Sequence, residues 1–209
     1  MRLKNVKGAN DIIVKGKYYV ANPYEYKGNW NKLFNNDNPI YIEIGMGKGN
    51  FIIENAKRYS DINFIGIEKY ESVLIRALDK APKDIPNLRF MCFDALKLDE
   101  VFNSNVDKIY LNFSDPWPKK KHAKRRLTSP IFLDLYEKIS KNEINIEQKT
   151  DNKGLFAYSL EQFNNHGYYF NEVSLDLPVD KEGNVPTEYE MKFRNKGVTI
   201  NYLNVTKKK

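Results

Sequence analysis

The chain has 209 residues, 41% of them hydrophobic, and its 34 Lys and Arg against 27 Asp and Glu give a formal net charge of +7. This length and composition favour one globular domain with its own core and exclude wholesale disorder. The sequence has no apolar run long enough to cross a bilayer, and its single cysteine excludes an intramolecular disulfide and a cysteine-based zinc site.

Residues 1–38 show little periodicity and mix Lys and Asn with aromatic residues. We expect an N-terminal basic and aromatic arm with one short helix, followed by the main domain over residues 39–209. The first residues lack the apolar segment of a signal peptide, so we expect a cytoplasmic protein. A pI near 9.2 favours a polyanionic partner.

From Ile40 onward, short β-rich runs alternate with helical stripes. Strands are expected over 40–44, 63–68, 88–93, 106–113 and 143–148, and helices over 51–59, 73–81, 131–139 and 154–166. Two last strands are expected near 168–177 and 197–205, followed by a frayed lysine tail at 207–209. This alternation predicts an α/β fold with a mostly parallel sheet, helices on both faces and an antiparallel edge.

The first expected strand ends in a glycine loop, Gly45-Met46-Gly47-Lys48-Gly49, with Glu43 just before it. A dinucleotide-binding fingerprint requires a third glycine at the sixth loop position, which is Asn50 here. Glycine lets the backbone approach a ligand closely, and an acid beside the loop suits a cation better than a pyrophosphate. The loop therefore favours S-adenosylmethionine, which carries a sulfonium and an ammonium group, over a plain tight turn.

Acidic residues stand at four of the five strand ends, where ligands of doubly wound sheets bind. They are Glu68, Asp94, Asp115 and Asp151. Glu68 is placed to accept hydrogen bonds from both ribose hydroxyls, and Asp94 from an adenine amino group. Each acid alone is more often a helix cap or a loop residue, whereas together they form an adenosine-shaped set of acceptors.

The most distinctive segment is Asn112–Pro118, with the sequence Asn-Phe-Ser-Asp-Pro-Trp-Pro. Prolines on both sides of Trp117 restrict the backbone, which would hold Asp115 and an aromatic plane at the cofactor edge; the alternative is only a rigid turn. The next eight residues, 119–126, include six Lys or Arg. A charge run is usually a solvated face, but its position beside a candidate active-site turn favours a phosphate-bearing macromolecule.

The segment Thr187-Glu188-Tyr189-Glu190 admits two interpretations. Its carboxylates and that of Asp151 can accept hydrogen bonds from the Watson–Crick edge of guanine, and Tyr189 can stack on a splayed base. The Thr-x-x-Glu spacing is also a helix capping box. The local pattern leaves both interpretations open.

Together these motifs resemble the bacterial tRNA (guanine-N7-)-methyltransferases of the TrmB type. The resemblance covers roughly residues 39–197 and rests on segments 43–49, 66–68, 110–127, 149–152 and 187–190. It implies a Rossmann-like class I S-adenosylmethionine-dependent methyltransferase. The implied reaction is transfer of a methyl group to N7 of the variable-loop guanosine, position 46, of tRNA.

The resemblance also implies roles for individual residues, with no metal and no indication of oligomeric state. The implied cofactor-binding residues are Glu43, Gly45, Gly47, Glu68, Asp94 and Asp115, and Asp115 is also the implied catalytic residue. Substrate binding is implied for Lys119, Asp151, Thr187, Glu188, Tyr189 and Glu190. RNA contacts are implied for Lys121, His122, Lys124, Arg125 and Arg126.

Guanine N7 has an in-plane lone pair and carries no proton, so its methylation needs no obligatory base. The enzyme must mainly align the reactants and compensate moving charge, for which Asp115 is suited.

One alternative is an amino-group methyltransferase of the N6-adenine or N2-guanine type, but Trp117 interrupts the Asp/Asn-Pro-Pro-aromatic motif of those enzymes. The other is a non-catalytic RNA-binding protein that retains the fold, against which the intact set of strand-end acids argues.

Overall fold

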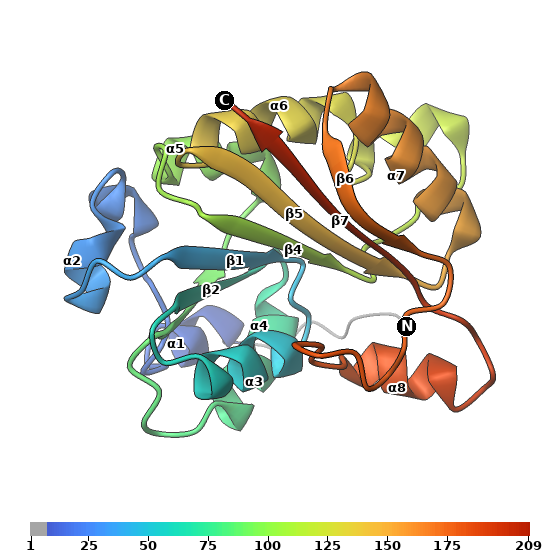
Figure 1. The fold of residues 1–209 in the computed structure, drawn as a ribbon. Coiled ribbons are helices and arrows are strands. Elements are labelled where there is room, and N and C mark those ends of the chain that lie inside the picture. The colour runs from blue at the N-terminus through green and yellow to red at the C-terminus, as the bar shows by residue number, and fades with distance from the viewer. Residues whose placement is uncertain (1–7) are drawn as a thin grey trace.

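Seven strands form one sheet in the computed structural model, which describes residues 8–209 (Figure 1). They are β1 Ile40–Ile44, β2 Asn63–Glu68, β3 Leu88–Cys92, β4 Lys108–Asn112, β5 Glu143–Thr150, β6 Tyr169–Ser174 and β7 Asn201–Lys208. Their order is β3-β2-β1-β4-β5-β7-β6. All pairs from β3 to β5 are parallel, and β7 runs antiparallel between β5 and β6. The mostly parallel α/β sheet is confirmed, with the antiparallel strand one position in from the edge.

Helices cover both faces of the sheet. They are α1 Ala9–Ile13, α2 Trp30–Phe34, α3 Asn50–Arg58, α4 Glu71–Lys80, α5 Leu98–Val101, α6 Pro130–Ile139, α7 Lys153–Asn165 and α8 Glu188–Arg194. In the view of Figure 1, α3, α4 and α8 lie below the sheet and α6 and α7 above it. None of the described helices is long and apolar enough to span a membrane.

The core divides at the sheet because successive strand residues point to opposite faces. Ile65 and Ile67 of β2 belong to the cluster formed with α5, α6 and α7. Phe64, from the same strand, belongs to the cluster formed with α1, α3 and α4. These two packed layers hold the carboxyl ends of the parallel strands in fixed positions along one edge.

The described part of the expected arm, residues 8–38, packs against the domain, while its first seven residues lie outside the described ones. Trp30 is fully buried, stacks on Phe102 with 4.8 Å between ring centroids, and donates a hydrogen bond to the Val101 carbonyl. Tyr18 and Val20 exchange backbone hydrogen bonds with Phe90 of β3. The segment contains two short α-helices and one 3-10 helix, more regular structure than its composition indicates.

The expected frayed tail is wrong. β7 continues to Lys208, where its antiparallel register pairs Lys207 with Ile144 and Lys208 with Glu143. The Lys207 ammonium also forms an ion pair with Glu137 of α6. Backbone pairing with the long strand β5 therefore orders a sequence whose local polarity is typical of a free end.

Candidate active site

The site lies where the strand order reverses, between β1 and β4, at the carboxyl edge of the sheet. Asn112, the last residue of β4, donates a 2.9 Å hydrogen bond to Oε1 of Glu43 on β1. Glu43 is 2% exposed, and its Oε2 has no hydrogen-bond partner among the described residues. Burial raises the pKa of Glu43 to about 8, although the Asn112 bond, the charge of Lys149 and the nearby Ile52 backbone N–H, which lies outside hydrogen-bond geometry, oppose the shift. A buried carboxyl oxygen without a partner fits a ligand that brings a cation or a donor.

The glycine loop follows β1 and turns beside Glu68. Gly45, Gly47 and Gly49 have φ angles of 75°, 59° and 76°, in the left-handed region that only glycine adopts at little cost. The Gly47 N–H donates to Oε2 of Glu68 at 3.1 Å, and the Tyr70 N–H donates to Oε1 at 3.0 Å. Burial raises the pKa of Glu68 above its ordinary value and outweighs these two bonds, which lower the pKa. The negative charge of Asp115 raises it further. The loop, Glu68 and Asp115 therefore share one neighbourhood.

Asp94 follows β3 on the same edge and caps the 3-10 helix Ala95–Lys97. Its Oδ1 accepts from the Leu96 N–H at 3.1 Å, and its Oδ2 pairs with the Lys69 ammonium at 2.8 Å. Burial favours a higher pKa for Asp94, but the Lys69 bond and the Leu96 N–H outweigh it and hold the pKa below its usual value. Asp94 is therefore anionic at neutral pH, with each oxygen already holding one partner.

The turn after β4 has an unusual backbone. Phe113 and Trp117 have φ angles of 50° and 41°, which are rare for residues with bulky side chains and indicate stored strain. Between them, Asp115 is exposed at the edge of the sheet. The Phe113 ring lies 5.0 Å from the ring of Tyr189 on α8. Such strain concentrates at functional sites, and here it aims an acid out of the sheet.

The capping interpretation of the 187–190 segment is confirmed in part, since Thr187 Oγ1 accepts from the Glu190 N–H at 2.8 Å and begins α8, whereas the Glu190 carboxylate bonds Lys149 and Arg194. Glu190 is fully buried and pairs with Lys149 of β5 at 3.2 Å and with Arg194 at 2.9 Å. A contact of Glu190 with a base would compete with these bonds. The fold therefore uses Thr187 and Glu190 to anchor α8.

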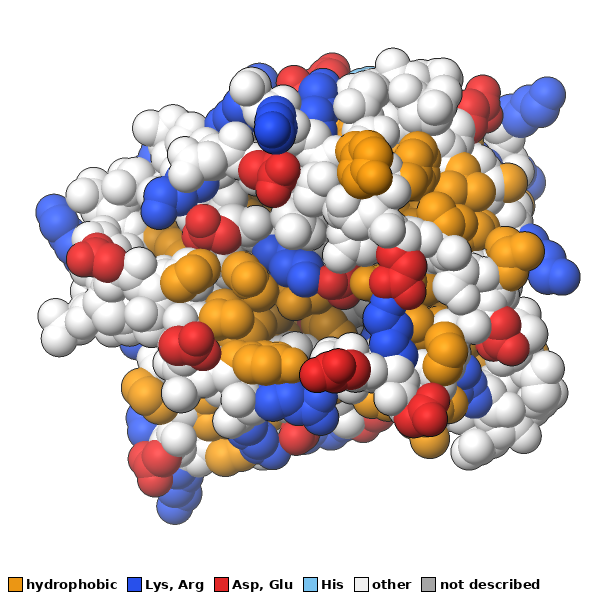
Figure 2. Space-filling model, viewed as in Figure 1, with side chains coloured by type: hydrophobic (Ala, Val, Ile, Leu, Met, Phe, Trp, Pro, Cys, Tyr) orange, Lys and Arg blue, Asp and Glu red, His pale blue; other side chains and the backbone are white. Residues whose placement is uncertain are grey.

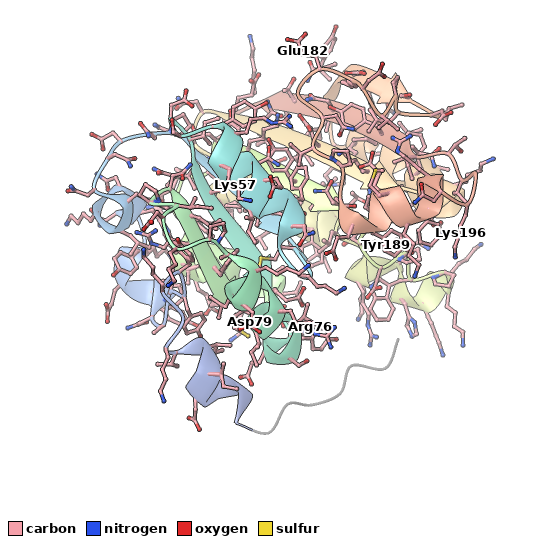
Figure 3. The ribbon with its side chains drawn as sticks, turned by 90° about the horizontal axis from the view of Figure 1, so that it is seen from below. Lys57, Arg76, Asp79, Glu182, Tyr189 and Lys196 are labelled. Carbon is pink, nitrogen blue, oxygen red and sulfur yellow. The ribbon has the colours of Figure 1, made fainter. Side chains whose placement is uncertain are left out.

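The two remaining residues of the segment, Glu188 and Tyr189, are exposed on α8, where Figure 3 labels Tyr189. Glu188 pairs with Lys48 of the glycine loop at 3.4 Å and with Lys80 of α4. These two lysines, the bond from Lys80 first, hold the pKa of Glu188 below its usual value. Burial, and then the charges of Asp151 and Asp115, raise the pKa of Tyr189. α8 thus stands between the glycine loop and the acids that follow β4 and β5.

The basic segment forms a 3-10 helix, Lys120–Arg125, directly after the turn. The exposed cations of segment 119–126 are Lys119, Lys120, Lys121, Lys124 and Arg125, whereas His122 and Arg126 are half-buried. His122 meets the Trp117 ring edge-on at 5.8 Å, and the Arg125 guanidinium lies 4.9 Å from the centroid of that ring. The cations therefore directly follow the turn that carries Asp115, and two of them contact its Trp117 ring.

A cavity of about 360 Å³ lies on the sheet face between α3 and residues 177–185, and the view of Figure 2 shows a hollow lined by apolar side chains below the centre of the molecule. Two ion pairs lie within its lining, Lys108 with Glu147 and Lys181 with Glu172, and the lining residue Lys149 pairs with Glu190 outside it. None of the strand-end acids lines it. Nor does any group of three His, Cys, Asp or Glu side chains within residues 8–209 suit a metal ion.

The sequence did not indicate the roles of Asn112, Lys149 and Arg194. Asn112 bonds to Glu43, and Lys149 and Arg194 both pair with Glu190. Lys149 is buried at the end of β5 and also accounts for the charge beside Glu43. The signal in the sequence was the position of this lysine directly before Thr150 and Asp151, at the end of a strand, where a side chain is expected to be buried. Its partner Glu190 is 41 residues away in the chain, so no local pattern connects the two.

The comparisons with known proteins agree on a methyltransferase. A family model described as "Putative methyltransferase" matches residues 37–203. The chain is 53% identical over 204 residues to a protein named tRNA (guanine-N(7)-)-methyltransferase from Geobacillus sp. (strain WCH70), covering 96% of this chain and 93% of that protein. It is 51% identical to the protein of that name from Listeria monocytogenes serovar 1/2a, covering 96% and 95%.

Solved structures of low sequence identity share the fold. One described as an antibiotic-related methyltransferase has a TM-score of 0.68 at 16% identity, covering 93% of this chain and 98% of that chain. A variant 16S rRNA (adenine(1408)-N(1))-methyltransferase from Catenulisporales acidiphilia, solved with the cosubstrate S-adenosylmethionine, has a TM-score of 0.62 at 12% identity, covering 90% and 92%. At such identities the likeness shows the fold and not the substrate.

Proposed function

Because this chain belongs to the tRNA (guanine-N7-)-methyltransferase family, we propose that its strand-end acids hold S-adenosylmethionine and that its target is the variable-loop guanosine at position 46 of tRNA. The enzyme transfers the methyl group to N7 of guanine. The observation that carries the site assignment is the buried Glu43, whose free Oε2 lies at the switch point of the sheet.

The residues present fit a cationic adenosyl donor. When bound, S-adenosylmethionine supplies a methyl group on a positively charged sulfur. Glu43 offers a buried carboxyl oxygen to the cationic end, and burial favours its neutral form until a cation arrives. Glu68 keeps acceptor capacity for ribose hydroxyls beyond its two backbone partners. Asp94 has acceptor capacity for the adenine amino group while it caps the 3-10 helix.

On the acceptor side, Asp115 orients the guanine and compensates the charge that develops on it. N7 attacks through its lone pair, so Asp115 need not remove a proton first. Tyr189 stacks on Phe193 and packs beside Phe113, and the part of its ring that stays exposed is proposed to contact the base. Asp151 and Lys119 are proposed to complete the substrate site.

Three of the exposed cations of the basic segment, Lys121, Lys124 and Arg125, are proposed to hold the tRNA backbone, with His122 beside them. Phosphate contacts of this kind fix the register of an RNA without reading its sequence. We also propose the cytoplasm as the working compartment, where Cys92, whose pKa is raised by burial to about 11, stays an unreactive thiol.

The proposal is tested by incubating the protein with unmodified tRNA transcript and methyl-labelled S-adenosylmethionine, followed by nucleoside analysis. Label is expected in 7-methylguanosine, and it should be absent from a transcript whose guanosine at position 46 is replaced by adenosine. An Asp115→Asn variant that still binds the cofactor is the matched control. Label in an exocyclic amino group, or equal labelling of both transcripts, would overturn the assignment.

A further inference from the structure

Arg126 is set apart from the other cations of the basic segment by its contacts. Its Nε donates to the Pro116 carbonyl at 3.0 Å, and its Nη2 donates to the Trp117 carbonyl at 3.1 Å. Its guanidinium lies 4.2 Å from the centroid of the Tyr158 ring on α7. Lys124, in contrast, is exposed. The guanidinium is thus held between a backbone turn and an aromatic face.

The two carbonyls belong to the residues that directly follow Asp115. Trp117 has a φ of 41°, a conformation that costs energy for a non-glycine residue and persists only where neighbouring contacts enforce it. A guanidinium can enforce it because its planar fork of N–H groups binds two acceptors in fixed relative directions. Two successive peptide planes are thereby tied to α7 through Tyr158.

We propose that Arg126 is a positioning residue, which holds the 115–117 turn in its strained form and so places Asp115 against the guanine. This assignment replaces the direct RNA contact that the sequence implied for Arg126, and it rests on the proposed role of Asp115. Two of the guanidinium donors and one of its faces are already used inside the protein. Replacing the fork by the single ammonium of lysine keeps the charge but loses the geometry.

The test compares Arg126→Lys with Lys124→Ala in steady-state methyl transfer. We expect Arg126→Lys to lower kcat by about ten- to a hundred-fold, as for a misplaced reacting group, with the KM for tRNA changed less than about two-fold. Lys124→Ala should do the opposite and raise that KM with kcat retained. Tyr158→Leu should also lower kcat, but by less than Arg126→Lys. Tyr158→Phe keeps the aromatic ring, so its kcat should stay near the wild-type value.

A second measurement reports the turn without any activity. Of the two tryptophans, Trp30 is fully buried and Trp117 is half-buried. Acrylamide should therefore quench Trp117 more strongly in Arg126→Lys than in the wild type, and Trp117→Phe assigns the signal.

An Arg126→Lys variant with wild-type quenching, or one with a raised KM and unchanged kcat, overturns the proposal. If it does not fold, as judged by thermal unfolding, Tyr158→Leu decides by the same two criteria. Failure of the wild-type enzyme to label tRNA would instead overturn the proposed function and leave the quenching result standing.

Discussion

The affinity for S-adenosylmethionine should rise with pH because the buried carboxyl of Glu43 must ionise as the cation binds. With a pKa of about 8, about nine-tenths of the free protein carries Glu43 protonated at pH 7. Binding at pH 7 therefore includes an ionisation cost of about 1.4 kcal/mol. Since binding releases a proton, the cost shrinks as pH rises, and the affinity should increase about twenty-fold between pH 6.0 and 7.5.

Isothermal titration calorimetry in two buffers of different ionisation enthalpy measures both the affinity and the proton released. Release should be near one proton at pH 6.0 and smaller at pH 7.5. Glu43→Gln cannot ionise, so its affinity should lie below the wild-type value at pH 6.0 and should not rise with pH. Glu68→Gln is the matched control, because burial also raises the pKa of Glu68.

The range ends at pH 7.5 because the ligand's own α-amino group, with an ordinary pKa of about 7.7–8.0, loses its charge above it. A wild-type affinity that is constant within two-fold would refute the reasoning. So would an unchanged pH slope in Glu43→Gln, since the titrating group would then lie elsewhere. A slope lost in Glu68→Gln but kept in Glu43→Gln would move the assignment to Glu68.

Four further outcomes are expected. Asp115→Ala should lower kcat for methyl transfer by about 10²–10³-fold, and a rate within a few fold of wild type would exclude its role. The pair Lys124→Ala and Arg125→Ala should raise the KM for tRNA and flatten its salt dependence in filter binding. Lys149→Met should cost about 1–3 kcal/mol of stability to urea, because it removes one buried partner of Glu190 while Arg194 still pairs with that carboxylate; an unchanged stability would contradict it. Gln148→Leu should be neutral or stabilising by about 1 kcal/mol, because no described residue bonds its buried amide; a marked loss of stability would show otherwise.

The strands and the placement of the acids were predictable because both follow from short-range patterns. Glu68 and Asp115 each follow an apolar β-rich run, and a parallel sheet brings the carboxyl ends of all such runs to one edge. The tight loop at Gly45, Gly47 and Gly49 was predictable for the same reason, because a loop with left-handed backbone angles requires glycine at those positions.

The contacts that hold the site were not predictable, because each joins residues far apart in the chain. Glu43 and Asn112 meet only when β1 and β4 pair, across 69 residues. The Thr187-x-x-Glu190 spacing correctly indicated a cap, but nothing local showed that Glu190 is fully buried. Its burial depends on Lys149, which the sheet brings to it from β5.

The placement of the acids also divides their tasks. Methyl transfer moves positive charge from the donor sulfur to the purine, so an acid that binds the donor cation stabilises the ground state at least as well as the transition state. Such an acid lowers the dissociation constant without raising kcat. In the proposed function the buried Glu43 binds the donor cation. Asp115, exposed on the turn that precedes the basic segment, is proposed to lie where the charge arrives. Glu43→Gln should therefore act on affinity and Asp115→Ala on kcat, and equal effects of both on kcat would show that the two acids act as one unit.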